Sequence, residues 1–158
     1  MYNLNEVVRG ATMCLSKAGL KIGNGDVKDF DIAAPNGAGI DFSINGVLYH
    51  VADCQDQPLT AATAQVALSS CIYLICASTA GALTSVKGTD CLAADLAAGT
   101  QVLRIPDPTA GTCPIGYIRV DTGAATTFTA GTTNLNAALI TDTYVDLAML
   151  PDPPFLTA

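Results

Sequence analysis

The 158-residue chain lacks tryptophan, has one histidine (His50) and has one glutamate (Glu6). A single histidine cannot supply a multi-histidine metal site within one subunit. The absence of tryptophan removes the usual stacking platform for sugars. The sequence also has no P-loop, no Gly-x-Gly-x-x-Gly after a strand and no Gly-x-Ser-x-Gly motif. These absences point away from enzymes, and we expect a structural protein without catalytic residues or cofactors.

Charge is also scarce, because only 13% of the residues are charged. The seven Lys and Arg residues are scattered and the net charge is −7, so nucleic acid is not an expected partner. Nearly all of the acid is Asp, which favours turns and caps over helix interiors. A surface with few ions to desolvate suits extensive contact with other protein.

The six cysteines form no Cys-x-x-Cys pair and no zinc-like spacing with His50. The first ten residues show no basic segment followed by an apolar one, so a secretory signal is not expected. We therefore predict free thiols that serve as small core side chains.

One uncharged stretch, Gln57–Val86, calls for a membrane test. Polar residues such as Gln65, Ser69 and Ser70 interrupt it, so it contains no run near the roughly 20 apolar residues that a span requires. The sequence predicts no membrane helix.

Turn signals recur about every ten residues, the spacing of an all-β domain. The clearest hairpin is 40–51, where apolar residues alternate on both sides of Asn45-Gly46, a pair suited to a type I′ turn. A second hairpin is predicted over 71–88. Residues 113–122 form a predicted strand with Ile115, Tyr117 and Arg119 on one face, and Ile118 and Val120 on the other. Short strands are expected before residue 40. Helix is plausible at Pro58–Leu68 and 91–99, with a short turn at 135–141.

Together these patterns predict a mainly β protein, a compact antiparallel β-sandwich or β-barrel. We divide the chain into an extended N-terminal arm (1–10), a single β-rich domain (11–150) and a C-terminal tail (151–158). The tail has too many prolines for regular structure, yet it carries the apolar Phe155 and Leu156.

The tetrapeptide Asp121-Thr-Gly-Ala matches the motif that carries the catalytic aspartate of retroviral-type aspartic proteases. Such a protease needs two carboxylates about 3 Å apart that share a proton, and hence a dimer of a chain with one motif. In that family the motif comes early and an apolar-apolar-Gly strand follows, whereas no such element follows Asp121. We favour a strand-end turn in which Asp121 bonds its own backbone and Gly123 takes positive φ. A DTG-type protease remains a remote alternative.

His50 and a cluster of three aspartates could each be functional or merely structural. His50 is in phase with Leu48, so we expect it to face solvent or an interface rather than act as a base. Asp26, Asp29 and Asp31 could hold calcium but lack the EF-hand spacing, so solvated loop carboxylates are the default and no metal site is assigned.

The C-terminal half carries a series of motifs: "CPIGYIRVDT", then "FTAGTTNL", then "ALITDTYVDLAMLP". In this order, and with "FSINGVLYHVAD" before them, they resemble a family of small structural virion proteins of tailed bacteriophages and prophages. The resemblance covers roughly residues 40–151. Members are capsid decoration (cement) or head-fibre components without enzymatic activity.

The resemblance implies a decoration protein on the outer capsid surface of the virion, assembled in the host cytoplasm. Its implied partners are the major capsid protein and itself, as a homotrimer, with no membrane. The alternative is a head-fibre or tail adaptor. We expect the arm and tail to contact the capsid or a neighbouring subunit through five residues: Met1, Tyr2, Leu4, Phe155 and Leu156.

Overall fold

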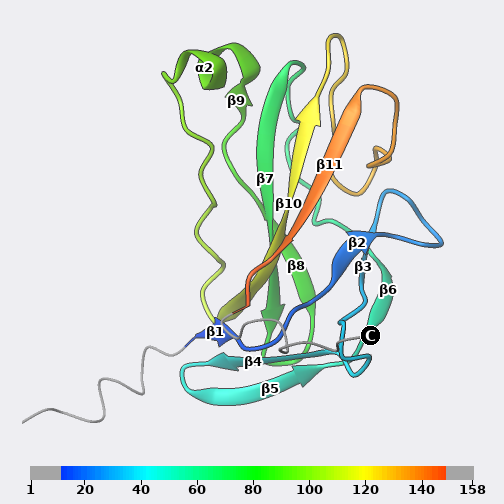
Figure 1. Cartoon of the computed structure of the whole chain (residues 1–158), viewed down its shortest axis with the longest axis vertical. Helices are drawn as coiled ribbons and strands as arrows, with labels where there is room; N and C mark the ends of the chain where they lie inside the picture. Colours follow the sequence, from blue (N-terminus) through cyan, green and yellow to red (C-terminus); the bar gives the residue numbers. More distant parts are fainter. Residues whose placement is uncertain (1–11, 149–158) are drawn as a thin grey trace, which may run out of the picture.

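The structure, a computed structural model of the chain, describes residues 12–148. Within them lie eleven strands and one helix (Figure 1). The strands are β1 (Met13–Cys14), β2 (Leu20–Ile22), β3 (Phe30–Ile32), β4 (Ile40–Ile44), β5 (Val47–Val51), β6 (Cys54–Gln57), β7 (Ser69–Ser78), β8 (Leu83–Lys87), β9 (Cys91–Leu92), β10 (Thr112–Thr122) and β11 (Ile140–Asp146). The helix is α2 (Ala93–Ala98).

The strands pair antiparallel in three separate sheets. The largest has the order β11-β10-β7-β8, with β9 also against β7; the others are β1-β4-β5 and β2-β3-β6. The mainly β, antiparallel prediction is confirmed. The β-barrel alternative is wrong, because the described strands leave all three sheets open at their edges.

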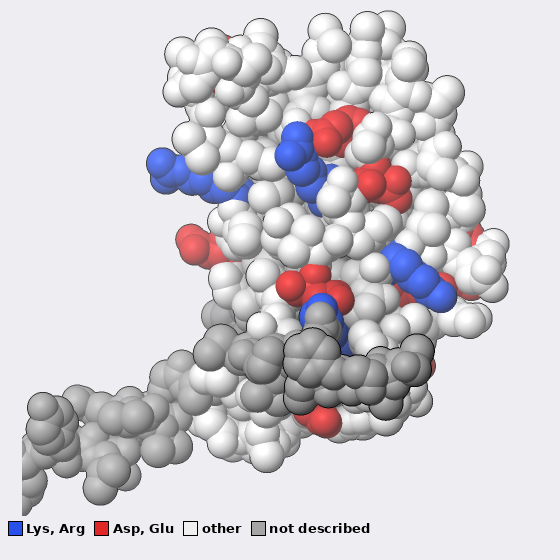
Figure 2. Space-filling model, viewed as in Figure 1, with Lys and Arg blue, Asp and Glu red and all other residues white. Residues whose placement is uncertain are grey.

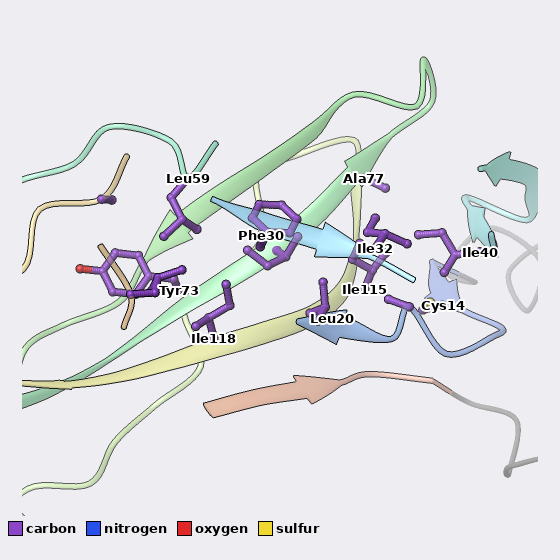
Figure 3. Packing of buried hydrophobic residues seen from close by; sticks show 14 of the residues in the cluster. Cys14, Leu20, Phe30, Ile32, Ile40, Leu59, Tyr73, Ala77, Ile115 and Ile118 are labelled. Atoms are coloured by element: carbon purple, nitrogen blue, oxygen red, sulfur yellow. The ribbon is translucent and has the colours of Figure 1, made fainter. Parts of the chain in front are cut away.

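The three sheets share one hydrophobic core. One face of β7 and β10 supplies Tyr73 and Ile118, and the smaller sheets cover that face with side chains such as Phe30 from β3 and Ile40 from β4. Figure 3 shows Phe30 and Ile32 in the same cluster as Ile118. The sheet β1-β4-β5 lies across the lower end of the large sheet in Figure 1. We call this end of the molecule, formed by β1, β4 and β5, the lower pole.

Both predicted hairpins are present. The β4–β5 turn has positive φ at Asn45 (52°) and Gly46 (81°), as a type I′ turn requires. In the β7–β8 connection Gly81 has a φ of 78°. The two turns need left-handed backbone at positions where the sequence supplies Asn or Gly.

Strand β7 explains the long uncharged stretch. Its alternate residues Tyr73 and Ile75 enter the shared core, while Leu74 and Cys76 on the opposite face are buried as well. The connection between α2 and β10 runs along that second face, where the main chain of Thr109 contacts the Cys76 thiol. A strand covered on both sides reads as a continuous apolar run. Within residues 12–148, the helix that the chain forms is too short to cross a bilayer.

Strand β10 corrects one sequence prediction. Tyr117 and Arg119 do lie on the face opposite Ile118 and Val120, but Ile115 is fully buried and belongs to the core with Ile118. The register against β7 shifts between Pro114 and Gly116, so one extra residue is inserted there. Such a bulge reverses the alternation, which a strict two-residue period cannot foresee.

The helix predictions have mixed outcomes. Helix α2 falls within the predicted 91–99 and ends at Gly99, whose φ is 69°. The turn at 135–141 is present, with the Ile140 N–H donating to the Ala137 carbonyl at 3.0 Å. The prediction of a helix at Pro58–Leu68 is wrong. There the chain is irregular, because Gln65 uses its backbone to bridge Phe128 and buries its side chain against the sheet.

Candidate interaction surface

The lower pole brings the two ends of the described chain together. The Asn45 N–H donates to Thr12 Oγ1 at 3.1 Å, which places Thr12 beside the β4–β5 turn. At the other end, the Leu147 N–H donates to the Ile115 carbonyl at 3.0 Å. Ile115 in turn lies near Cys14 of β1 in the core (Figure 3). The described chain therefore begins and ends at the same pole (Figure 1).

The predicted contact residues lie next to this pole in sequence but outside the described residues. Met1, Tyr2 and Leu4 precede residue 12, and Phe155 and Leu156 follow residue 148. Their role in binding stays a prediction.

Strand β5 is the most exposed apolar element of the lower pole. Its Val47 is 55% exposed and its Leu48 is 69% exposed. On the inward face Tyr49 stacks on Phe42, with ring centroids 5.8 Å apart. Sequence alternation predicted this hairpin but did not show that β5, rather than β4, would be the uncovered strand.

The opposite pole carries a second group of exposed apolar side chains, which sequence reasoning missed. Leu68, Leu92 and Leu139 are 54%, 45% and 64% exposed. Leu68 and Leu139 also have positive φ, at 53° and 65°, a conformation rarely adopted outside Gly and Asn. Apolar residues at strand ends look like core residues in a sequence, so no local signal separates them.

The Asp-Thr-Gly motif lies at the end of β10. Asp121 Oδ1 accepts from Arg119 Nε at 3.0 Å and from the Ser70 hydroxyl on the neighbouring strand. The nearly buried Thr122 accepts from the Ser69 N–H at 3.1 Å. The carboxylate is thus engaged within the sheet.

The predicted strand-end position is confirmed, but two of its details are wrong. Asp121 binds side chains rather than its own backbone, and left-handed backbone occurs at Ala125 (φ 59°) rather than at Gly123. Glycine is needed at position 123 for space, since a Cβ there would lie 2.9 Å from the Leu139 Cβ.

We expect the variant Asp121→Asn to keep the fold and to leave any peptide cleavage by the purified protein unchanged. The Arg119–Asp121 pair is partly exposed, with 44% and 32% of the two side chains accessible, so its loss should cost under about 1 kcal/mol. Thermal unfolding and a peptide-cleavage assay of the purified protein measure both. Loss of peptide cleavage in a variant that is still folded would instead support the protease alternative.

The remaining aspartates mostly hold loops by accepting backbone N–H groups. Asp146 takes those of Gly19 and Leu20, both at 3.1 Å, and so fastens β2 to β11. Asp56 takes those of Gly25 and Asp26, at 2.9 and 2.8 Å. This use explains why the acid of the chain is Asp, whose short side chain reaches nearby backbone.

Of the three carboxylates considered for calcium, Asp29 and Asp31 are buried, so the expectation that they are solvated is wrong for these two. Asp26 and Asp31 have separate partners. Asp26 pairs with Lys28 at 2.6 Å, and the buried Asp31 accepts from the Asp56 N–H at 2.8 Å. Burial raises the pKa of Asp29, and the nearby Asp26 carboxylate adds to that rise. No group of three or more metal-ligating side chains is present in the 12–148 range.

His50 faces solvent, as predicted, with 52% of its side chain accessible. Its Nδ1 lies 2.9 Å from Asp41 Oδ1 across the β4–β5 ladder. The pair sits on the outer face of the hairpin beside Leu48.

All six cysteines are free thiols, and five of them are buried. Burial raises the pKa of Cys14 to about 11 and those of Cys71 and Cys113 to about 12. The prediction that the thiols act as core side chains is confirmed for these residues. A raised thiol pKa suppresses the thiolate that redox or nucleophilic chemistry would need.

A cavity of about 360 Å³ lies near α2, open to solvent. It is lined by Thr89, Cys91, Thr100, Gln101, Val102 and Arg104. Arg104 is its one charged lining residue, and it brings together no acid–base pair. The face seen in Figure 2 is mostly neutral, with charged side chains in small separate groups.

Comparison of the chain with protein-family models, curated proteins and solved structures finds no match. The fold is that of a mainly β protein built of open antiparallel sheets.

Proposed function

We propose that this protein is a decoration (cement) protein of a tailed bacteriophage. In this proposal it is a homotrimer of compact, sandwich-like subunits on the outer capsid surface, where it binds the major capsid protein and stabilises the head. The virion resemblance of residues 40–151 supports this proposal, as do the β-rich fold and the low surface charge. A surface poor in ions can be buried against protein at little desolvation cost.

The observation that carries the proposal is the lower pole. Thr12 and Leu147, near the two ends of the described chain, both lie at this pole, which also carries the exposed Val47 and Leu48. Both terminal segments, 1–11 and 149–158, can therefore reach one common surface. Weak contacts made by both, and repeated in every subunit of a trimer, multiply through avidity.

Deletion of residues 152–158 is expected to lower capsid occupancy at least tenfold at limiting protein. The deletion removes Phe155 and Leu156, and burial of two such side chains contributes about 3 kcal/mol or more. The measurement is cryo-EM occupancy of particles to which purified protein has been added back.

The matched control is deletion of Thr157–Ala158, which keeps both apolar residues and should leave occupancy unchanged. Full occupancy by the protein lacking 152–158 would contradict the role given to the tail. Gel densitometry of purified particles distinguishes a decoration protein from a head-fibre or tail adaptor. The copy number of a decoration protein is comparable to that of the major capsid protein, whereas an adaptor is present in far fewer copies.

A further inference from the structure

Strand β5 has an open hydrogen-bonding edge. It pairs with β4 from Ile44↔Val47 to Ile40↔Val51 without a bulge, and it is the last strand of its sheet. In a two-residue hairpin the pair that closes the turn is hydrogen-bonded, and the bonded pairs then alternate. The N–H and C=O groups of Leu48 and His50 therefore point outward.

This edge lacks the devices that usually prevent strand pairing. Among the described edge strands longer than two residues, β2 carries Lys21, β6 carries Asp56, β8 carries Lys87 and β11 carries Asp142. Strand β5, with the sequence VLYHV, has no Lys, Arg, Asp, Glu or Pro. An edge strand without a bulge, a proline or any of these charged residues is a template for another strand.

Residues 1–11 suit such an edge in sequence and in length. Tyr2 and Leu4 alternate with Asn3 and Asn5, the two-residue period of a half-buried strand. Eleven residues span up to about 36 Å when extended. They join the described chain at Thr12, beside the β4–β5 turn.

We infer that the open edge of β5 binds the N-terminal segment, residues 1–11, of a second copy of the chain as an added strand. Within one copy, β1 and β5 are on opposite edges of their sheet, with β4 between them. To pair with its own β5, the segment would have to cross the end of β4 and reverse its direction. In a rotated neighbour the same segment meets the open edge directly.

The arm and the edge are different surfaces, so the contact is head-to-tail, and a three-fold rotation between copies closes it into a ring. This deepens the homotrimer in the proposed function and rests on that part of it, but it requires no capsid. Backbone pairing with Leu48 and His50 sets the register, and the exposed Val47 and Leu48 side chains gain apolar neighbours.

The test compares four proteins by size-exclusion chromatography with light scattering, under reducing conditions. These are the full chain, a deletion of residues 1–10, Leu48→Pro and Leu48→Thr. Proline removes the outward N–H of residue 48 without removing a bond to β4, and threonine retains that N–H. We expect the full chain and Leu48→Thr to form the oligomer, and the deletion and Leu48→Pro to be monomers.

Mixing supplies the decisive result. The deletion protein retains the edge and Leu48→Pro retains the arm, so the two monomers should form a one-to-one pair. Hydrogen exchange on the full chain gives a readout that does not depend on proline, since the Leu48 and His50 amides should exchange at least tenfold faster after deletion of 1–10.

A monomeric full chain, an oligomer that survives the deletion, or exchange that the deletion does not change overturns the inference. A monomer whose β5 amides are protected from exchange would show that the arm pairs with β5 of its own copy. That result would also overturn the inference. Failure of the decoration role has a different signature, namely an intact ring that does not bind capsids.

Discussion

Replacement of Gln65 by leucine is expected to lower the free energy of unfolding by about 3–5 kcal/mol. The Gln65 side chain is fully buried. Its Nε2 donates to the carbonyls of Ser69 and Val120 at 3.1 and 2.9 Å, and its Oε1 accepts from the Tyr73 hydroxyl at 3.3 Å. Leucine fills similar space, but the Tyr73 hydroxyl loses its acceptor and the Ser69 and Val120 carbonyls each lose a donor. The Ser69 carbonyl still accepts from Thr122 Oγ1 at 3.2 Å.

Gln65 also fixes a long irregular connection to the sheet. Its backbone exchanges hydrogen bonds with Phe128, at 2.7 and 3.2 Å, and the Phe128 ring packs edge-on against Tyr73. Loss of the side-chain contacts should therefore loosen both segments at once. Near-native exchange rates for the Gln65 and Phe128 amides in the variant would contradict this.

The measurement is urea unfolding, with two comparison variants. Tyr73→Phe removes one member of the same network and should cost about 1 kcal/mol. Gln55→Leu makes the same chemical change at an exposed site and should stay within about 0.5 kcal/mol. Equal stability of Gln65→Leu and Gln55→Leu would show that the buried amide does not hold the structure.

The second large effect is a loss of stability in mild alkali. Burial raises the thiol pKa values of Cys14, Cys71 and Cys113 to about 11, 12 and 12 from an ordinary value of 9.0. In the unfolded chain these thiols lose protons around pH 9, whereas the folded protein retains them. The folded state then binds more protons, so stability falls as pH rises.

By pH 10 each of the three thiols should have cost about 1 to 2 kcal/mol, or about 4 kcal/mol together. The free energy of unfolding should be nearly constant from pH 7 to 8 and then decline steeply. Burial also raises the pKa values of Tyr73 and Tyr144, which steepens the decline at higher pH.

Urea unfolding under reductant at a series of pH values measures this slope. Cys113→Ala should lower the slope between pH 9 and 10 by about one proton, because one buried thiol is gone. A stability that does not change up to pH 10 would mean that these thiols ionise in the folded protein as readily as in the unfolded chain.

The sequence determined the features that depend on one turn or one strand. Asn45-Gly46 specified its hairpin because few residues tolerate positive φ. The virion-like motifs and the segments 1–10 and 151–158 were also visible in sequence, and their proposed contacts await experiment.

The errors share a cause, since each concerns a residue whose place is set by a distant partner. Ile115 enters the core because β10 bulges against β7. Residues 58–68 are not helical because the Gln65 side chain donates to the Val120 carbonyl, 55 residues further along the chain. A prediction from periodicity assumes that strand pairing is regular and that the repeat is uninterrupted. The bulge in β10 and the irregular segment 58–68 break both assumptions.

By itself, the sequence determined an antiparallel, mainly β protein with free thiols and few charges, because turn chemistry and alternation are local properties. Only the tertiary structure decided which strand edge stays open, that both described ends meet at one pole, and that Asp121 is bound to Ser70 and Arg119. Those features depend on which strands become neighbours, and the free energy of packing the shared core sets that choice.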